Sequence, residues 1–276
     1  TALAYIAAGA PGFAERNQIA RITIEGVISE DRDQLALIKK IADAKHVKAL
    51  IVVINSPGGT ATGGEALFEA LRRVAASKPV VAQFGTVATS AAYMAGLAAD
   101  RIFARGNTIS GSVGVIWQWP EVSALLEKLG IRMNAITSGP LKANPNPYQP
   151  LDAPGKAVVE EMVAESKRWF LALVANRRGI DTKGVKGLED GRVYTGRDAL
   201  GLKLIDEIGA DQEVLSWLQT SRGMAKSLRV VDWRPRRPVE VGPFRLALNA
   251  IGRALGVEAQ QLAEVAQAIA DNPRVA

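Results

Sequence analysis

Ser90 is the residue whose neighbours best suit it to act as a nucleophile. An apolar run at 79–84 leads into Gly85 and a turn of small residues, and Ser90 then opens an alanine-rich segment that we expect to be helical. A serine at a strand-to-helix turn holds its hydroxyl where a ligand can reach it, and the first amides of the helix point the same way. Serine is also a common N-cap, so the turn alone leaves a purely structural role open.

A pair of glycines follows the preceding strand. The segment 55–59 (NSPGG) comes directly after 48–54 (KALIVVI), an apolar run typical of a strand covered on both faces. Two glycines let the backbone approach a ligand and aim amide hydrogens at it, as in an oxyanion hole, where one donor is worth about 3 to 4 kcal/mol. A tight turn would look the same. Because α/β sheets bind ligands at the ends of neighbouring strands, we expect this turn to lie beside Ser90.

A nucleophilic serine needs a base, and the chain has one histidine. His46 precedes a predicted strand whereas Ser90 follows one, so we expect them at opposite edges of the sheet, which disfavours a Ser-His-Asp triad. A lysine is the remaining common base, provided that burial lowers its pKa. Lys142 fits, because the nine residues on either side carry no charge. An ordinary loop lysine remains the alternative.

The composition limits the classes of protein. The 276 residues, 48% of them hydrophobic, suffice for one large domain or one domain with appendages. The absence of cysteine excludes disulfides and thiolate zinc sites. The net charge of +6 is spread along the chain, with its densest cluster at 229–237, so we expect no nucleic-acid partner. We expect no metal and no cofactor.

Strand and helix patterns alternate, which predicts an α/β fold of repeated ββα-like units. We expect strands at 18–28, 48–54, 80–84, 101–104 and 132–136, and helices at 31–43, 60–76, 90–98, 120–129 and 151–178.

We divide the chain into three parts. The first 14 residues (TALAYIAAGAPGFA) are apolar and small, and we expect residues 1–18 to hold the outer end of a membrane anchor that begins before Thr1. No apolar run in the chain reaches the roughly 18 residues of a complete span. Residues 19–218 form the main domain. Residues 219–276 form an appendage, with an Arg- and Pro-rich segment at 221–238 and helices at 244–255 and 258–270. The appendage is either a partner- or membrane-binding tail or a helical cap on the same domain.

Several segments, in one order and with compatible spacing, resemble the bacterial signal peptide peptidase A (protease IV) family of Ser/Lys peptidases in its short single-domain form. The resemblance covers roughly residues 19–218 and implies a Clp protease/crotonase-like fold. The matching segments are 22–28 (ITIEGVI), 54–59 (INSPGG), 88–94 (ATSAAYM), 99–104 (ADRIFA), 109–115 (ISGSVGV), 137–142 (TSGPLK), 190–196 (DGRVYTG) and 201–209 (GLKLIDEIG).

The resemblance implies a role for each matching residue. Ser90 would be the nucleophile, Lys142 the general base and Ser112 the hydroxyl that orients the lysine. The amides of Gly59 and Ala91 would form the oxyanion hole. The implied reaction is peptide hydrolysis through an acyl-enzyme, with no metal or nucleotide.

Small residues around the serine indicate a shallow apolar substrate pocket. We expect Gly58, Ala88 and Ala92 to bind substrate. The family usually has two glycines after the serine, whereas this chain has Ala91 and Ala92, which still supply amides but restrict the backbone.

The resemblance also implies a setting. Family members form dome-shaped rings in which neighbouring subunits supply the serine and the lysine of one site, so we expect a homo-oligomer in the form of an octameric ring. We expect it at the bacterial inner membrane with its catalytic domain on the periplasmic, or extracytoplasmic, side. There it would degrade remnant signal peptides and other small or unfolded polypeptides.

Of four other functions, the first is disfavoured by the sequence and three remain open at this level. A Clp-type protease needs a histidine some two dozen residues after Ser90, and none is there. A crotonase-type acyl-CoA enzyme would use backbone amides without Ser90 or Lys142. A non-catalytic scaffold would show no hydrolysis, and a phage-type maturation peptidase would share the chemistry but not the substrate.

Overall fold

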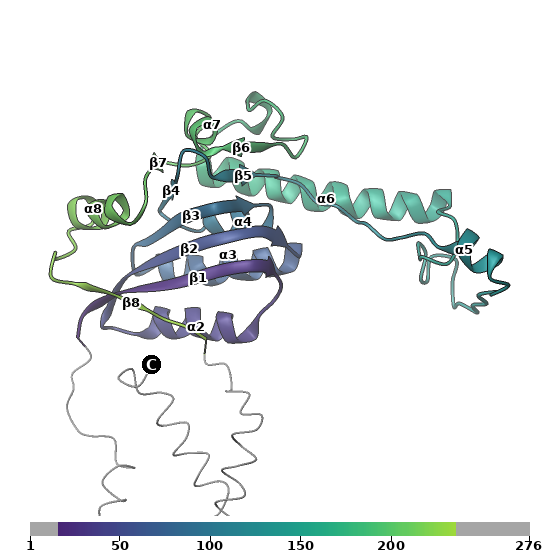
Figure 1. Ribbon diagram of the computed structural model, residues 1–276, viewed down its shortest axis with the longest axis horizontal. Helices are drawn as coiled ribbons and strands as arrows, with labels where there is room; N and C mark the ends of the chain where they lie inside the picture. The colour runs from purple at the N-terminus through teal and green to yellow at the C-terminus, as the bar shows by residue number, and fades with distance from the viewer. Residues whose placement is uncertain (1–15, 236–276) are drawn as a thin grey trace, which may run out of the picture. The chain divides into compact units, whose positions relative to one another are not determined.

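The computed structural model describes residues 16–235, which form an eight-stranded sheet with helices packed against it (Figure 1). The strands are β1 (Gln18–Ile28), β2 (Val47–Gly59), β3 (Val80–Thr89), β4 (Arg101–Ala104), β5 (Ile109–Gly111), β6 (Val193–Thr195), β7 (Glu207–Ile208) and β8 (Arg229–Asp232). The helices are α2 (Arg32–Asp43), α3 (Ala61–Ala75), α4 (Ala91–Gly96), α5 (Ser123–Lys128), α6 (Ala153–Arg178), α7 (Gly196–Gly201) and α8 (Asp211–Ser221), with a 3₁₀ turn η1 (Thr182–Gly184). Among the described residues, no helix is both long and apolar enough to span a membrane.

The order of the strands brings three turns to one edge of the sheet. The order is β6-β5-β3-β2-β1-β8, with β4 beside β3 and β7 beside β4. The strands β1, β2 and β3 pair in parallel, and β3 pairs in parallel first with β4 and then, nearer its end, with β5. The chain therefore leaves β2, β3 and β5 at the same edge, which is where parallel sheets place their functional loops.

The sheet buries both faces, because successive side chains of a strand point to opposite sides. Helices α2, α3 and α4 and the second half of α6 cover one face, and α8 covers part of the other. In β3, Val80 and Ala82 pack into the larger core and Val81 into the smaller one with α8. The larger core holds Tyr93, Phe84, Phe170, Ile22, Ile38 and Leu71, all of them almost fully buried.

Residues 116–152, which we call the arm, differ from the prediction. The strand expected at 132–136 is wrong: no strand forms there, and Met133 and Ile136 are exposed. The helix expected at 120–129 is reduced to α5. The arm lies at the end of α6 that is remote from the sheet (Figure 1), so its apolar run has no neighbouring strand with which to pair.

The C-terminal boundary of the main domain also differs from the expected residue 218. Helix α8 continues to Ser221, and β8 joins the sheet in parallel beside β1, where Arg21 forms an ion pair with Asp232. The compact unit ends at Pro235. A strand of four residues shows too little alternation of apolar and polar side chains to be predicted from its own sequence, because its pairing with β1 is what makes it a strand. The expected helices at 244–255 and 258–270 and nearly all of the N-terminal segment lie outside the described residues.

Candidate active site

Ser90 occupies a strained turn between β3 and α4. Its backbone has φ 54° and ψ −124°, a conformation that costs a residue with a side chain on the order of 1–3 kcal/mol. Its N–H donates to the carbonyl oxygen of Gly111 at 2.9 Å, and its carbonyl oxygen accepts from the N–H of Met94 at 2.9 Å. Ser90 is the N-cap residue of α4 by position, but its side chain makes no capping hydrogen bond, so its hydroxyl does not stabilise the start of the helix. Such strained strand-to-helix turns present nucleophilic serines in hydrolases.

Side-chain hydrogen bonds join the 55–59 turn to the turn that contains Ser90. The Asn55 carboxamide oxygen accepts from the N–H groups of Thr86 and Val87 at 3.0 and 3.2 Å, where β3 bends toward Ser90. The hydroxyl of Thr89 donates to the carbonyl oxygen of Pro57 at 2.9 Å. The two turns are therefore cross-linked on both sides. The sequence analysis missed Asn55 and Thr89, although a polar residue directly after a buried strand was a signal.

The buried hydroxyl of Ser56 shapes the backbone of the same turn. It donates to the carbonyl oxygen of Gly26 at 2.6 Å and accepts from the N–H of Gly58 at 3.1 Å. Gly58 has φ +106°, which L side chains rarely adopt. A buried side chain thus holds the glycine in a conformation that leaves its α-carbon facing Ser90.

Gly58 lies against Ser90, as we expected from the topology. A β-carbon on Gly58 would lie 2.8 Å from the β-carbon of Ser90 and 3.2 Å from the amide nitrogen of Ala91. As the first residue of α4, Ala91 has an N–H with no acceptor inside the helix. Gly59 packs against the backbone of Ile28 in β1, and a β-carbon there would collide with it. The peptide between Gly58 and Gly59 is therefore close to the serine and to a helix amide that lacks an intrahelical partner.

Ser112 lies next to the same turn. It follows Gly111, whose carbonyl oxygen accepts the Ser90 amide, and β5 pairs with β3 at Thr89. Ser112 is half-buried, has φ 52°, and donates its N–H to the carbonyl oxygen of Arg192 at 2.9 Å. The structure thus brings Gly58, Gly59, Ser90, Ala91 and Ser112 to one edge of the sheet.

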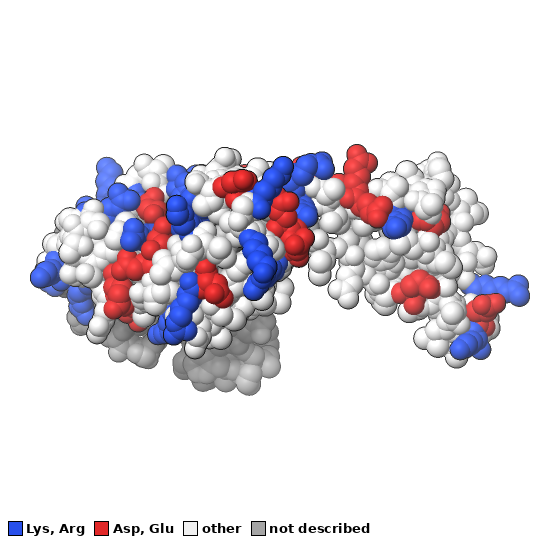
Figure 2. All heavy atoms as spheres, turned by 90° about the horizontal axis from the view of Figure 1, so that it is seen from above, with Lys and Arg blue, Asp and Glu red and all other residues white. Residues whose placement is uncertain are grey.

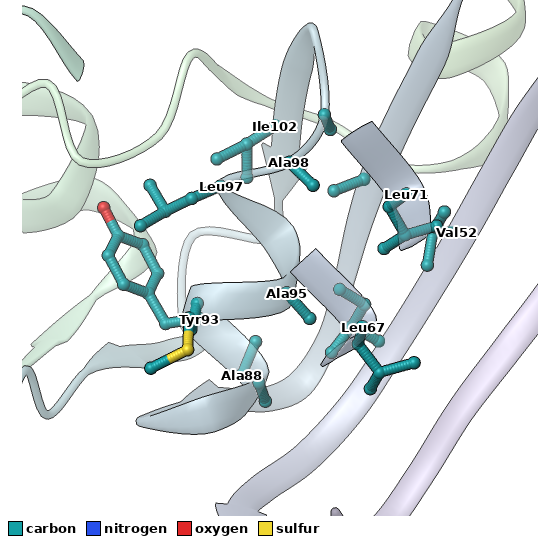
Figure 3. Packing of buried hydrophobic residues seen from close by; sticks show 14 of the residues in the cluster. Val52, Leu67, Leu71, Ala88, Tyr93, Ala95, Leu97, Ala98 and Ile102 are labelled. Carbon is teal, nitrogen blue, oxygen red and sulfur yellow. The ribbon is translucent and has the colours of Figure 1, made fainter. Parts of the chain in front are cut away.

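Ala88 and Ala92 do not line a surface pocket, and this expectation is corrected. Both side chains are completely buried in the larger core. Figure 3 shows Ala88 among neighbours such as Leu67 and Ala95. Ala88 is in β3, and alternation points its methyl group to the face opposite that of its neighbours in sequence. The neighbouring Ala91 packs closely against α3, because a β-carbon on Gly64 would lie 2.9 Å from that of Ala91.

Lys142 is not near Ser90 in the single chain. It belongs to the arm, which lies at the opposite end of α6 from the helix that Ser90 precedes (Figure 1). Within residues 16–235, the Lys142 side chain is exposed and makes no hydrogen bond or ion pair. Hydrogen bonds of the arm stay inside it or reach the first turn of α6.

Helix α6 joins the arm rigidly to the sheet domain. Phe170 and Val174 are buried in the larger core. The Arg177 guanidinium donates to the carbonyl oxygens of Leu97 and Ala99 at 2.7 and 2.9 Å, just beyond α4. In the first half of α6, only Gly155 is buried. The helix is therefore fixed beside α4 at one end and carries the arm at the other.

The arm is mostly uncharged and exposes large apolar side chains. Acidic and basic side chains intermingle over the sheet domain in Figure 2, whereas much of the arm, at the right, is white. Helix α5 has no buried residue. The exposed large apolar residues of the arm are Ile116, Trp117, Leu125, Leu129, Ile131, Met133, Ile136, Leu141, Tyr148 and Leu151. A surface of this kind is typical of protein–protein contacts.

His46 is remote from the site, as expected. It precedes β2, whereas Ser90 follows the parallel strand β3, so the two lie at opposite edges of the sheet. Its ring stacks on that of Trp233 with centroids 6.0 Å apart. Among the described residues, no group of three or more His, Asp or Glu side chains could hold a metal ion.

Comparison with known proteins identifies the family. The model of peptidase family S49 matches residues 72–225, more than half of the chain. The chain belongs to peptidase family S49. A Clp protease family model matches residues 19–109 of this S49 peptidase, which confirms the Clp protease-like α/β fold.

Individual relatives agree with this assignment. The S49 peptidase is 32% identical over 210 residues to slr0021 of Synechocystis sp., a protein named for a protease, with 76% of each chain covered. It is 31% identical over 235 residues to a protein of Enterococcus faecium named for signal peptide peptidase SppA, covering 80% of this chain and 68% of that protein. Among solved structures, a membrane-bound stomatin-specific protease matches with a TM-score of 0.53 and 18% identity, over 80% of this chain and 99% of that one, which supports the fold alone.

Proposed function

We propose that this S49 peptidase is a serine endopeptidase in which Ser90 is the nucleophile and Lys142 the general base. The observation that carries the proposal is the strained Ser90 turn, whose hydroxyl does not cap α4 and which lies beside Gly58 and the Ala91 amide. Strain of this kind persists where surrounding contacts maintain it, and it clusters at active sites. The resemblance to Ser/Lys peptidases supports Lys142 as the partner, because no histidine is near the serine.

The chemistry follows from these groups. Neutral Lys142 Nζ takes the proton of Ser90 Oγ as the oxygen attacks the peptide carbonyl carbon. The amides of Gly59 and Ala91 stabilise the oxyanion, and the lysine ammonium then gives its proton to the leaving amine. Lys142 then takes a proton from water, whose oxygen attacks the acyl ester, and returns that proton to Ser90 Oγ as the acid leaves. The Ser112 hydroxyl orients the lysine.

The site is shared between copies of the chain. Lys142 lies on an arm remote from the Ser90 of its own chain, and the arm exposes apolar side chains that a neighbouring copy would cover. In this proposal each Lys142 serves the Ser90 of a neighbour, in a closed ring of eight copies. When one surface of a subunit binds a different surface of the next, a ring forms if the rotation between neighbours closes.

We propose remnant signal peptides and other small or unfolded polypeptides as substrates, at the extracytoplasmic side of the bacterial inner membrane. An extended chain reaches a serine at a sheet edge, whereas a folded domain does not. The name of the Enterococcus faecium relative refers to the same class of substrate.

The test is turnover of a fluorogenic peptide with small apolar residues before the cleavage site. We expect Ser90→Ala and Lys142→Ala each to lose essentially all turnover, and a mixture of the two, dissociated and reassembled together, to regain part of it. Lys128→Ala, in the same arm, is the matched control and should retain activity. Full activity of either dyad variant alone would contradict the assignment of that residue, and an inactive mixture of assembled variants would contradict the shared site.

A further inference from the structure

The loop around Lys142 is a pair of backbone turns. The N–H of Lys142 donates to the carbonyl oxygen of Gly139 at 3.1 Å, and the N–H of Asn144 donates to that of Leu141 at 3.3 Å. Ala143, between them, has φ 63°. The Lys142 side chain is exposed and makes no hydrogen bond with the described residues. The position of its α-carbon is therefore set by the backbone turns alone.

The side chain of Asn144 joins these turns to the start of α6. Its amide nitrogen donates to both carboxylate oxygens of Asp152, at 3.0 Å each. Asp152 is also the N-cap of α6 and accepts from the N–H of Gly155 at 2.8 Å. A β-carbon on Gly155 would lie 2.8 Å from Asp152 Oδ1 and closer still to the carboxamide oxygen of Asn144. We call Asn144, Asp152 and Gly155 the latch.

The latch goes beyond what helix capping requires. Asp152 and the Gly155 amide are enough to cap α6. Asn144 adds nothing to the cap, but it binds the same carboxylate and so ties the lysine loop to α6. Through Arg177 and the buried Phe170, α6 is in turn fixed to the sheet domain.

We propose that Asn144 is a positioning residue for the peptidase reaction: through the latch it sets where Lys142 stands relative to the serine that it serves. This inference rests on the proposed function, in which Lys142 is the base. A long side chain magnifies any displacement of its backbone, and a misplacement of about 1 Å in a catalytic group costs about 100-fold in rate. The latch acts on the turnover step rather than on peptide binding.

The decisive experiment adds Asn144→Ala either to the chain that supplies the lysine of a shared site or to the chain that supplies the serine. The parent mixture combines Ser90→Ala chains, which supply the lysine, with Lys142→Ala chains, which supply the serine. In one arrangement Asn144→Ala is added to the Ser90→Ala chain, and in the matched control to the Lys142→Ala chain. We expect kcat to fall about tenfold in the first arrangement, with KM within about twofold, and to stay near the parent value in the second.

The second experiment reverses the latch in an otherwise unchanged chain. Asn144→Asp sets two carboxylates against each other and should lower kcat about tenfold. Adding Asp152→Asn restores one amide and one carboxylate with the original net charge, and asparagine is also a good N-cap. We expect the double variant to recover most of the lost kcat, which a loss of helix capping would not allow.

The outcomes separate the inference from the proposed function. Equal losses in both mixed arrangements, or no loss in either, would overturn the positioning role of Asn144. An inactive parent mixture beside an active wild type would refute the shared site instead. The reversal experiment then still decides the inference, since failure of Asp152→Asn to rescue Asn144→Asp would overturn it.

Discussion

Gly58 and Ser90 meet across the ends of β2 and β3, so closely that a β-carbon on Gly58 would lie 2.8 Å from that of Ser90. Two hydrogen bonds maintain this close approach. The N–H of Gly58 donates to the Ser56 hydroxyl, and the Thr89 hydroxyl donates to the carbonyl oxygen of Pro57. If Ser90 is the nucleophile and the Gly59 and Ala91 amides are the oxyanion donors, as we propose, these hydrogen bonds fix them before a substrate arrives, which is the condition for strong electrostatic stabilisation.

Gly58→Ala should therefore lower peptide turnover at least about 100-fold, because the new methyl group displaces Ser90 or the Ala91 amide. Gly26→Ala is the matched control. Gly26 also has a positive φ, +71°, but nothing lies within 4 Å of its β-carbon position, so it shares the backbone strain without the collision. Peptide kinetics and thermal unfolding of both variants check this. A similar loss of activity in the two would show that strain alone is responsible.

Ser112→Ala should lower kcat about tenfold or more, if its hydroxyl orients the lysine of a neighbouring copy. The control is Ser110→Ala, two residues earlier, in β5. The Ser110 hydroxyl is fully buried and has no hydrogen-bond partner among the described residues, so its removal loses no bond and should leave stability unchanged or raised. If Ser112→Ala retains wild-type kcat while Ser110→Ala does not, the assignment belongs to the other serine.

Tyr93→Phe should destabilise the fold by about 1 to 2 kcal/mol, since it leaves the carbonyl of Leu204 without its buried donor. The phenol is fully buried and donates to that carbonyl at 2.8 Å, and burial raises the pKa of Tyr93 well above its usual value. Denaturant unfolding measures the change. Peptide kcat of the folded variant should remain within about twofold, because Tyr93 faces the core and not the serine. An unchanged unfolding free energy would mean that the carbonyl finds another donor.

Asp232→Asn should weaken the attachment of β8, but only above acidic pH. The hydrogen bond and charge of Arg21 hold the pKa of Asp232 below its usual value. A carboxyl group with a lowered pKa stabilises the fold fully above its ordinary pKa, and this contribution is lost as the pH falls through the folded-state pKa.

The unfolding free energies of wild type and Asp232→Asn should thus differ by up to about 1 kcal/mol at neutral pH, the range for exposed pairs, and converge in acid. Asp43→Asn removes the more exposed ion pair with Lys39 on α2 and serves as the control, with a smaller effect. A difference between wild type and Asp232→Asn that grows as the pH falls would contradict the sign of the pKa shift.

Much of the fold is encoded locally. The strands that begin at Gln18, Val47 and Val80 and the long helix ending at Arg178 follow from runs and periodicities of single segments. The Ser90 turn follows from a strand, small residues and a helix in succession. That Gly58 lies beside it could be inferred because parallel strands deliver their turns to one edge of the sheet.

Long-range contacts decided the remainder. Whether Ala88 of β3 and Ala92 of α4 face a ligand or a core depends on how the helices pack against the sheet, which no local pattern contains. The pairing of β8 with β1 depends on a partner some 200 residues away. Lys142 has the sequence context of a base, but its separation from Ser90 is set by α6, since a 26-residue helix spans about 39 Å at 1.5 Å per residue and is fixed to the sheet domain at one end. The sequence by itself determined the chemical groups and the strand-to-helix turn that holds Ser90. Only the tertiary structure decided that Ser90 and Lys142 of one chain lie far apart. Their separation depends on which half of α6 packs against the sheet domain, and this packing involves residues distant in the sequence.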